Sequence, residues 1–222
     1  VDIDNEEELS HTLLATECST LTDMQKTTTE NAIKLSDNTQ KAIDAIHEKD
    51  EAALTKVLTE TNQLKREIEK LKKSLYTDEL TAVSNRKWLY HALIAEDQES
   101  FKNDGLLAMI DLNYFKQIND THGHIIGDKV LIFIASELKK TKQHVVRYGG
   151  DEFMLFFSDR FGLNNAIQTL SALREKVISK KLKASNSTFK SSFSFGVVEY
   201  KAGEKFVDVT QRADAKMYED KI

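Results

Sequence analysis

The sequence predicts an α+β protein in which an antiparallel sheet with packed helices follows an all-helical N-terminal segment. Three observations lead to this fold class. The chain has no proline, and its eight glycines all fall between Gly105 and Gly203, so the first hundred residues lack the strongest helix breakers. Leucine, isoleucine and valine recur in that region at helical spacing. Short apolar runs separated by helical stretches appear only after about residue 77.

Composition limits the function classes. The 222 residues allow one domain with an accessory segment, or two small domains, and 40% hydrophobic with 30% charged residues is a globular composition. The net charge of -5 argues against a general nucleic-acid binder. No run approaches the roughly 18 apolar residues of a membrane span, and no secretion signal is recognisable. Cys18 is the single cysteine, which fits a reducing, cytoplasmic compartment, including the cytoplasmic part of a membrane-anchored protein.

The second half of the N-terminal segment carries a heptad pattern. Apolar residues recur there at spacings of three, four and seven, with Thr61 in the remaining seam position. These residues are Leu54, Val57, Leu64, Ile68, Leu71 and Leu75. A seam of about three heptads with charges outside it predicts a dimerising coiled coil.

Residues before this seam are less regular. Leu14, Leu21, Leu35 and Ile46 are roughly helically spaced but are diluted by threonine and serine. We expect helix throughout 6–76, as one long helix, or as a hairpin if residues 36–39 (Ser-Asp-Asn-Thr) cap a new helix. Residues 1–76 thus form the expected helical segment, and 77–222 the expected α+β domain.

The elements of the second domain follow one another in a recognisable order. Apolar strands are expected at 106–110 and 193–197, and a hairpin at 145–157 around Gly149 and Gly150. Helical stretches are expected at 86–98, 127–140, 164–180 and 207–221. The order β-α-β-β-α-β with extra helices predicts a sheet of the ferredoxin-like kind.

Three acids lie where strands end. Asp111 directly follows the first apolar strand, and Asp151 and Glu152 follow the Gly-Gly turn of the hairpin. If the two strands are neighbours, these carboxylates converge and need a hard cation to offset their repulsion. A pair of such cations can activate an attacking hydroxyl and stabilise a leaving pyrophosphate. Taken singly, however, acids in turns are usually ordinary surface residues.

Five segments together resemble the GGDEF family of diguanylate cyclases, in the order of that family. They are Asp78–Arg86, Asp111–Asp128, Arg147–Phe153, Ser194–Val197 and Ala213–Lys221. The resemblance covers about 77–222 and implies a nucleotide-cyclase-like fold. It also implies the family's reaction, in which two GTP molecules condense to cyclic di-GMP and pyrophosphate.

The resemblance also implies the residues of the site. Asp111 and Asp151 are expected to bind magnesium with the carbonyl of Leu112, as two Mg²⁺ per half-site or with Mn²⁺ instead. Glu152 is expected to assist at the metal or at the ribose 3′-hydroxyl. The expected phosphate contacts are Lys116, with a catalytic role, Lys221, and the backbone N–H groups near Phe115.

Asn119 and Asp128 match the guanine readers of the family. A carboxylate can accept from guanine N1–H and the 2-amino group, a pair of donors that adenine lacks. Gly149 and Gly150 allow the hairpin backbone to approach the nucleotide. His122 and His124 flank a glycine and are expected to be structural, since zinc would need a third protein ligand.

Several positions depart from the family pattern. Ala82 replaces a usual glycine, and Asn113 replaces a common second aspartate, which predicts reduced activity at most. Lys140 and Gln143 stand at the product-inhibition positions, where the family has arginine and aspartate, so strong feedback is not expected. A phosphate-binding arginine that the family has beyond the position of Lys221 is not in this sequence.

Three functional hypotheses follow. The first is an active cyclase, working as a homodimer in which the helical segment brings two GTP-loaded domains face to face and controls them. The second is a catalytically silent domain that binds GTP or cyclic di-GMP as a receptor. The third is a dimerising interaction module. Retention of Asp111, Asp151 and Glu152 favours the first.

Overall fold

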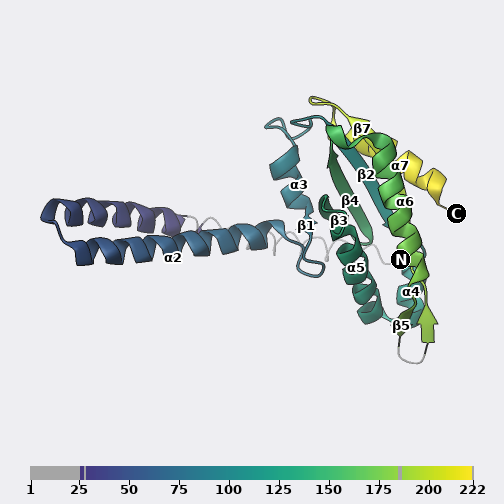
Figure 1. The fold of residues 1–222 in the computed structure, drawn as a ribbon, viewed down its shortest axis with the longest axis horizontal. Helices are drawn as coiled ribbons and strands as arrows, with labels where there is room; N and C mark the ends of the chain where they lie inside the picture. The colour runs from purple at the N-terminus through teal and green to yellow at the C-terminus, as the bar shows by residue number, and fades with distance from the viewer. Residues whose placement is uncertain (1–25, 28, 185–186, 222) are drawn as a thin grey trace, which may run out of the picture. The chain divides into compact units, whose positions relative to one another are not determined.

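A computed structural model describes residues 26–27, 29–184 and 187–221 (Figure 1). The chain divides into two compact units, residues 1–72 and 73–222, which we describe separately. The expected helix over 6–25 and Cys18 lie outside the described residues. None of the helices in the described ranges is both long and apolar enough to cross a membrane.

The first unit contains a helical hairpin. Residues 29–48 form a helix that ends at Lys49 and Asp50, and α2 (Glu51–Tyr76) follows at once. Asp50 N–H donates to Ala45 O and Lys49 N–H to Ile46 O, the two bonds of a Schellman motif, with Lys49 at a φ of 55°. Oδ1 of Asp50 then accepts hydrogen bonds from the backbone N–H groups of Ala52 and Ala53, and so caps the start of α2. The expected continuous helix is therefore wrong, and so is the alternative turn at 36–39, which is helical.

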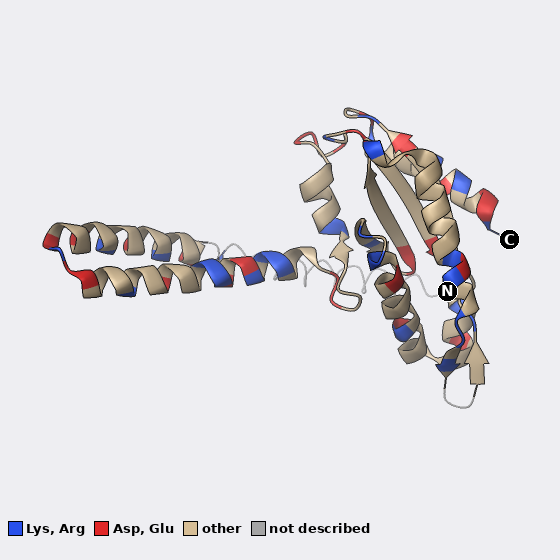
Figure 2. Cartoon of the chain, viewed as in Figure 1, with Lys and Arg blue, Asp and Glu red and all other residues tan. Residues whose placement is uncertain are grey.

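The two helices of the hairpin share a buried seam. Nδ2 of Asn38 donates to Oγ1 of Thr61 over 3.3 Å, which joins the two helices directly. The buried residues repeat every seven positions on both helices: Asn31, Asn38 and Ala45 on the first, and Val57 and Leu64 on α2. Part of the predicted dimer seam is thus already buried within one chain. Leu58 and Leu71 of α2 are exposed, and the second half of α2 is rich in Lys and Arg (Figure 2).

The second unit is a mixed sheet covered by helices. Its elements in chain order are β1 (Ser84–Asn85), α3 (Arg86–Leu93), β2 (Gly105–Leu112), α4 (Phe115–His122), α5 (His124–Lys139), β3 (His144–Gly149), β4 (Glu152–Ser158), the 3-10 turn η1 (Asp159–Phe161), α6 (Leu163–Ser179), β5 (Leu182–Ala184), β6 (Ser187–Phe189), β7 (Phe193–Tyr200) and α7 (Phe206–Asp220). The order in the main sheet is β1-β3-β4-β2-β7, and β5 and β6 form a separate hairpin. All pairs in the main sheet are antiparallel except β1 with β3, which is a correction to the expected antiparallel sheet.

Both faces of the sheet are buried. Along β2, Leu106, Ala108 and Ile110 pack into one hydrophobic cluster, to which α4, α5 and α6 contribute. Leu107 and Met109 pack into the other, with α3 and α7. This period of two places helices on both faces of the sheet (Figure 1) and makes β2, which lies between β4 and β7, an interior strand covered on both faces.

The four expected strands are confirmed, while several helix bounds and three short elements differ. The predicted helix 86–98 ends at Leu93, because Asp97 accepts backbone hydrogen bonds from Glu99 and Ser100 in a tight turn. The helix expected from Gly127 already begins at His124. The sequence did not predict the short strands β1, β5 and β6. Helix α4 was not among the predicted helical stretches, although the backbone N–H groups near Phe115 were expected to lie at the start of a helix.

Candidate active site

The three acids meet at one end of the central strands. Asp111 of β2 lies directly opposite Glu152, the first residue of β4, and Asp151 precedes Glu152 in the turn. Strands β2 and β4 are therefore neighbours, which is the condition under which the three acids were expected to converge. Figure 2 shows acidic positions at this end of the sheet. On its other side, Asp111 lies opposite Ser194 of β7.

The electrostatics of this cluster are those of crowded carboxylates. Burial, and then the charge of Asp111, raise the pKa of Asp151. Burial and the charges of Asp111, Asp151 and Asp214 likewise raise the pKa of Glu152. Asp214 belongs to α7 and was not singled out from the sequence, because its proximity depends on how α7 packs.

Lys221 supplies the positive charge of the cluster. Its Nζ lies 3.0 Å from Oδ1 of Asp111, and this hydrogen bond raises the pKa of Lys221. The neighbouring Asp220 fixes the end of α7: its Oδ2 accepts from the backbone N–H of Phe195 at 3.0 Å and from Arg174 of α6. These two contacts position Lys221, and neither Asp220 nor Arg174 was a predicted site residue.

The donor set suits a hard cation bound together with substrate. Within the described residues, no three His, Cys, Asp or Glu side chains are arranged as a ready-made metal site. Asp111 and Asp151, with the Leu112 carbonyl, offer oxygen ligands only. Magnesium commonly uses one or two carboxylates and completes its coordination with water and phosphate oxygens. The residues therefore fit a Mg²⁺ ion that arrives with a nucleotide.

A turn links β2 to α4. The N–H of Asn113 donates to the carbonyl of Ser192, and its Oδ1 accepts from the hydroxyl of Ser194 at 2.9 Å. Tyr114 follows in the left-handed region, with a φ of 57°, and α4 begins at Phe115. The side chain of Asn113 is thus held by Ser194 of β7. The sequence analysis noted Asn113 only as a replacement for an aspartate and did not predict this contact. Lys116 is exposed on the first turn of α4.

The predicted guanine readers lie where α4 meets α5. Oδ1 of Asn119 is buried and has no hydrogen-bond partner among the described residues. A Cβ on Gly127 would lie 1.9 Å from that oxygen and 3.3 Å from Cζ of Phe115. The glycine therefore provides the space that the Asn119 side chain occupies. Asp128 follows Gly127 and is exposed. The amide oxygen of Asn119 and the carboxylate of Asp128 therefore both lie at the junction of α4 and α5.

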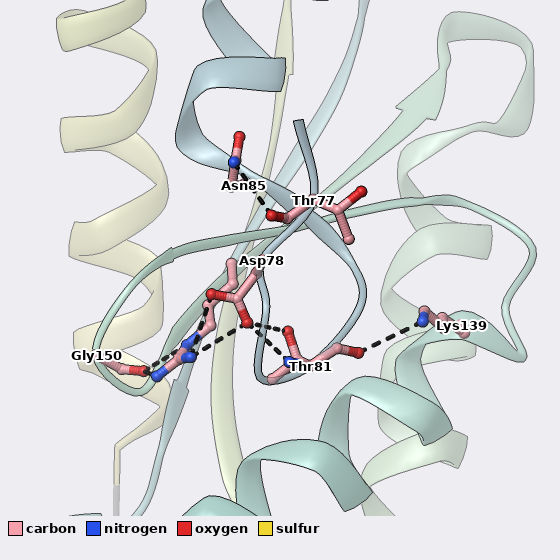
Figure 3. A network of polar contacts seen from close by, with 7 residues as sticks. Thr77, Asp78, Thr81, Asn85, Lys139 and Gly150 are labelled. Carbon is pink, nitrogen blue, oxygen red and sulfur yellow. Dashed lines mark hydrogen bonds and ion pairs between the residues drawn. The ribbon is translucent and has the colours of Figure 1, made fainter. Parts of the chain in front are cut away.

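The Gly-Gly turn is held by a network that reaches the start of the domain (Figure 3). The strand register shifts between Arg147 and Gly149, a bulge that redirects the chain into the turn, and Gly150 has a φ of 47°. Nη2 and Nε of Arg147 donate to the carbonyl of Gly150 at 2.8 and 3.0 Å. Nη1 lies 3.2 Å from Oδ1 of Asp78.

Asp78 is the centre of that network. Its Oδ1 accepts from the backbone N–H and the hydroxyl of Thr81. Burial alone would raise the pKa of Asp78, but the Thr81 hydrogen bonds and the charge of Arg147 lower it below its ordinary value. Ala82 has a φ of 52°, in the region that favours glycine, which explains the family's usual residue there. Nζ of Lys139 donates to the carbonyl of Ala82, and also to that of Thr81 at 3.5 Å, which is the contact drawn in Figure 3.

Lys140 and Gln143, which stand at the family's product-inhibition positions, both bind other residues of the same domain. Lys140 pairs with Glu137 at 2.5 Å, and Nε2 of Gln143 donates to the carbonyl of Thr141 at 3.3 Å. The side chain of Glu137 is 3% exposed and also pairs with Lys180 at 2.7 Å. His122 stacks on Phe189, with ring centroids 4.7 Å apart, a packing role like the structural one expected from the sequence.

Comparisons with known proteins place the chain in a family. The family model described as diguanylate cyclase, GGDEF domain, matches residues 75–222. Diguanylate cyclase DgcP of Pseudomonas aeruginosa is 32% identical over 159 residues, covering 69% of this chain and 24% of that protein. Diguanylate cyclase VdcA of Vibrio cholerae is 32% identical over 172 residues, covering 73% of this chain and 49% of that protein.

Solved structures match a larger part of the chain. The coiled coil and GGDEF domain of DgcB from Caulobacter crescentus, in complex with c-di-GMP, matches with a TM-score of 0.63 at 32% identity, covering 76% of this chain and 92% of that one. Diguanylate cyclase SiaD from Pseudomonas aeruginosa, in complex with its activator SiaC, matches with a TM-score of 0.61 at 26% identity, covering 97% of this chain and 84% of that one.

The region that the family model matches, residues 75–222, coincides with the second unit of the fold. The chain spans about a quarter of the length of DgcP and about half that of VdcA. The family model covers the acidic cluster, the Gly-Gly turn and α7 together. This chain belongs to the diguanylate cyclase GGDEF-domain family.

Proposed function

We propose that this protein is a diguanylate cyclase that condenses two GTP molecules into cyclic di-GMP and two pyrophosphates, a reaction that belongs in the cytoplasm, where GTP is found. The observation that carries the proposal is the meeting of Asp111, Asp151, Glu152 and Lys221 at one end of the sheet. A site that combines several carboxylates with a lysine suits the transfer of a nucleotidyl group, because cations and an ammonium group must both face the triphosphate.

Each proposed role follows from placement. Asp111 and Asp151, with the Leu112 carbonyl, would hold magnesium, which when bound would neutralise phosphate charge and favour ionisation of the attacking hydroxyl. Lys221 would exchange its bond to Asp111 for phosphate oxygens. Lys116 and the N–H groups around Phe115, at the start of α4, would contact the same phosphates. Glu152 would hold the metal or the ribose 3′-hydroxyl.

Guanine would be read at the junction of α4 and α5. The partnerless Oδ1 of Asn119 is an acceptor for an N–H of the base, and the carboxylate of Asp128 would accept from the other donors of guanine. Adenine presents a hydrogen-bond acceptor at N1, so it would leave these acceptors unsatisfied. Gly149 and Gly150 have no atoms within 4 Å of the position a Cβ would take, which leaves room beside the turn for a nucleotide.

Two domains must face each other, because each 3′-hydroxyl attacks the α-phosphorus of the other GTP. We infer that helical hairpins of two chains associate through the exposed residues Leu58, Leu71 and Ile46, and thereby raise the local concentration of the second half-site. Such a dimer would let the helical segment regulate turnover by setting the orientation of the domains. Sedimentation of the chain with and without residues 1–72 would test the dimer separately.

The experiment that tests the proposed reaction is incubation of the chain with GTP and Mg²⁺, followed by chromatographic separation of the nucleotides. We expect cyclic di-GMP to form from GTP, and no cyclic product to form from ATP. Parallel equilibrium binding of GTP distinguishes a silent receptor, which would bind the nucleotide and return it unchanged. Recovery of intact GTP from the incubation would reject the cyclase assignment.

A further inference from the structure

The lining of one groove on the GGDEF domain contains neither the three acids of the cluster nor Lys221. The groove has a volume of about 410 Å³ and is lined by α4, by the C-terminal part of α6 and by the segment between β6 and β7. On α4 its wall includes Gln117, Ile118 and Thr121, whose spacings of three and four place them on one face of the helix. Lys116 and Asn119 lie on the opposite face. The groove is therefore distinct from the proposed nucleotide site.

The walls of the groove suit a flat apolar group. Ile118 of α4, Ile178 of α6 and Phe189 of β6 provide its apolar surface. The ring of Phe189 is stacked on that of His122, with an interplanar angle of 22°, which fixes its orientation. A volume of this size falls within the range of small-molecule sites, and such sites combine apolar walls with a few polar groups.

The polar groups of the groove favour an anionic substituent. Ser191 is 3% exposed, and its hydroxyl has no hydrogen-bond partner among the described residues, although Ser191 lines the groove. A buried hydroxyl without a partner is unfavourable unless a ligand or water binds it. Lys190 contributes an exposed ammonium group beside it, and the lining contains no aspartate or glutamate.

We propose that this groove is a binding site for a small aromatic carboxylate. The ring lies between Ile178 and Phe189, and the carboxylate accepts hydrogen bonds from Lys190 and from the Ser191 hydroxyl. Asn113 and Tyr114 also line the groove and form the turn that follows Asp111 and Leu112. Because this turn adjoins the proposed metal ligands, a carboxylate bound in the groove alters GTP turnover. That consequence rests on the proposed function, whereas binding of the carboxylate does not depend on it.

Binding is tested without nucleotide, using indole-3-carboxylate as the probe and indole-3-carboxamide as its neutral counterpart. Isothermal titration of the chain should give saturable binding of the carboxylate, with the carboxamide about tenfold weaker, because a charge-assisted hydrogen bond is lost. Amide resonances of Gln117 and Ser192 should shift in the same titration. Absence of saturable binding of the carboxylate would overturn the proposal, whether or not the protein turns over GTP.

Two tryptophan variants localise the site. Ile178 and Ile167 lie on the same helix α6 and are 37% and 38% exposed, but only Ile178 lines the groove. Ile178→Trp should fill the groove and weaken the carboxylate at least about tenfold, while Ile167→Trp should bind as the parent does. Parent-like binding by a folded Ile178→Trp would contradict the location. If that variant does not fold, Lys190→Gln decides: it should abolish the preference for carboxylate over carboxamide, and an unchanged preference would overturn the proposal.

Discussion

Nζ of Lys221 lies 3.0 Å from Oδ1 of Asp111, so the residue that follows the last helix is paired with a carboxylate at the end of the interior strand β2. The pair brings together two residues that are 110 positions apart in the sequence. It forms because Asp220 fixes the end of α7 on β7 and α6. In the proposed reaction this pair would open, so that the carboxylate would help to hold magnesium and the ammonium group would contact phosphate oxygens.

Removal of one acid should separate activity from stability. We expect Asp151→Asn to abolish turnover, because the remaining carboxylate cannot organise the cations. The raised pKa of Asp151 means that its ionised form is disfavoured in the fold, so the variant should be as stable as the parent at pH 7, or more stable. Steady-state kinetics and urea unfolding measure the two effects. Asp208→Asn, at an exposed position on α7, is the control, and parent-like turnover by Asp151→Asn would refute the metal assignment.

The close packing of Gly127 against Asn119 leads to a second prediction. Gly127→Ala would place its Cβ 1.9 Å from Oδ1 of Asn119, so the amide must move. We expect KM for GTP to rise about tenfold, on the scale of one lost hydrogen bond to the base. Lys129→Ala, exposed on the same helix, should leave KM unchanged. A Gly127→Ala enzyme with the parent's KM would show that Asn119 does not read the base.

The network of Asp78, Arg147 and Gly150 should matter for turnover more than for folding. In Arg147→Lys the single ammonium group cannot hold both the Gly150 carbonyl and Asp78, because it lacks the planar fork of arginine. We expect kcat to fall while binding of GTP is retained. The measurement is a comparison of kcat with the dissociation constant for GTP. Arg160→Lys, an arginine of η1 outside the network, should change neither.

Glu137 should make stability depend on pH in the acid range. Burial alone would raise its pKa, but hydrogen bonds from Lys140 and Lys180 lower it from 4.5 to about 2. Because the folded pKa lies below the unfolded value, its contribution is complete above about pH 4.5 and is lost as the pH falls towards 2. Glu137→Gln should therefore lower the free energy of unfolding by on the order of 1–3 kcal/mol at pH 7.

That difference should shrink between pH 4.5 and pH 3, because the Glu137 carboxylate of the unfolded parent becomes protonated there while that of the folded parent stays ionised. Urea unfolding at pH 7, 4.5 and 3 measures it. Glu175→Gln, at an exposed position on α6, serves as the matched control and should show little change at any pH. A Glu137→Gln penalty that stays constant across this range would show that packing, and not the ion pairs with Lys140 and Lys180, accounts for it.

The position of the turn in the helical hairpin can be tested by whether one substitution, Lys49→Gly, raises or lowers stability. Lys49 has a φ of 55°, where glycine is favoured, so Lys49→Gly should stabilise the hairpin by about 0.5–1 kcal/mol. In a continuous helix the same change would destabilise by about 1 kcal/mol. Unfolding followed by helical circular dichroism gives the sign. Lys56→Gly, within α2, should destabilise in either case.

Most of the GGDEF domain could be predicted from the sequence, because its core strands are apolar runs that end in acids or glycines. The sequence predicted that the acids converge only if their strands are neighbours, and the structure pairs Asp111 of β2 with Glu152 of β4. The positions of Asp214, Asp220 and Arg174 could not be predicted, since they depend on how α6 and α7 pack on the sheet. Helix 86–98 was too long because the turn at Asp97 contains no proline or glycine.

The helical segment shows the same limit more clearly. A turn was sought at residues 36–39, where cap-forming side chains cluster, yet the chain turns at Lys49 and Asp50. Asp50 is a good N-cap, but lysine is an unusual residue at a left-handed helix end. The heptad seam of α2 predicted a dimerising coiled coil, and two of its residues, Val57 and Leu64, are buried within a single chain. The pattern alone did not reveal that residues 29–48 of the same chain cover part of it.

The most direct test of the account is a ³¹P NMR time course of the chain with GTP and Mg²⁺, beside the Asp151→Asn variant. Condensation of two GTP molecules releases one pyrophosphate for each phosphodiester bond formed. We predict that phosphodiester and pyrophosphate signals grow together in that ratio in the parent and are absent in the variant. Loss of GTP without a phosphodiester signal, or equal product from both proteins, would contradict the assignment of this site as a diguanylate cyclase centre.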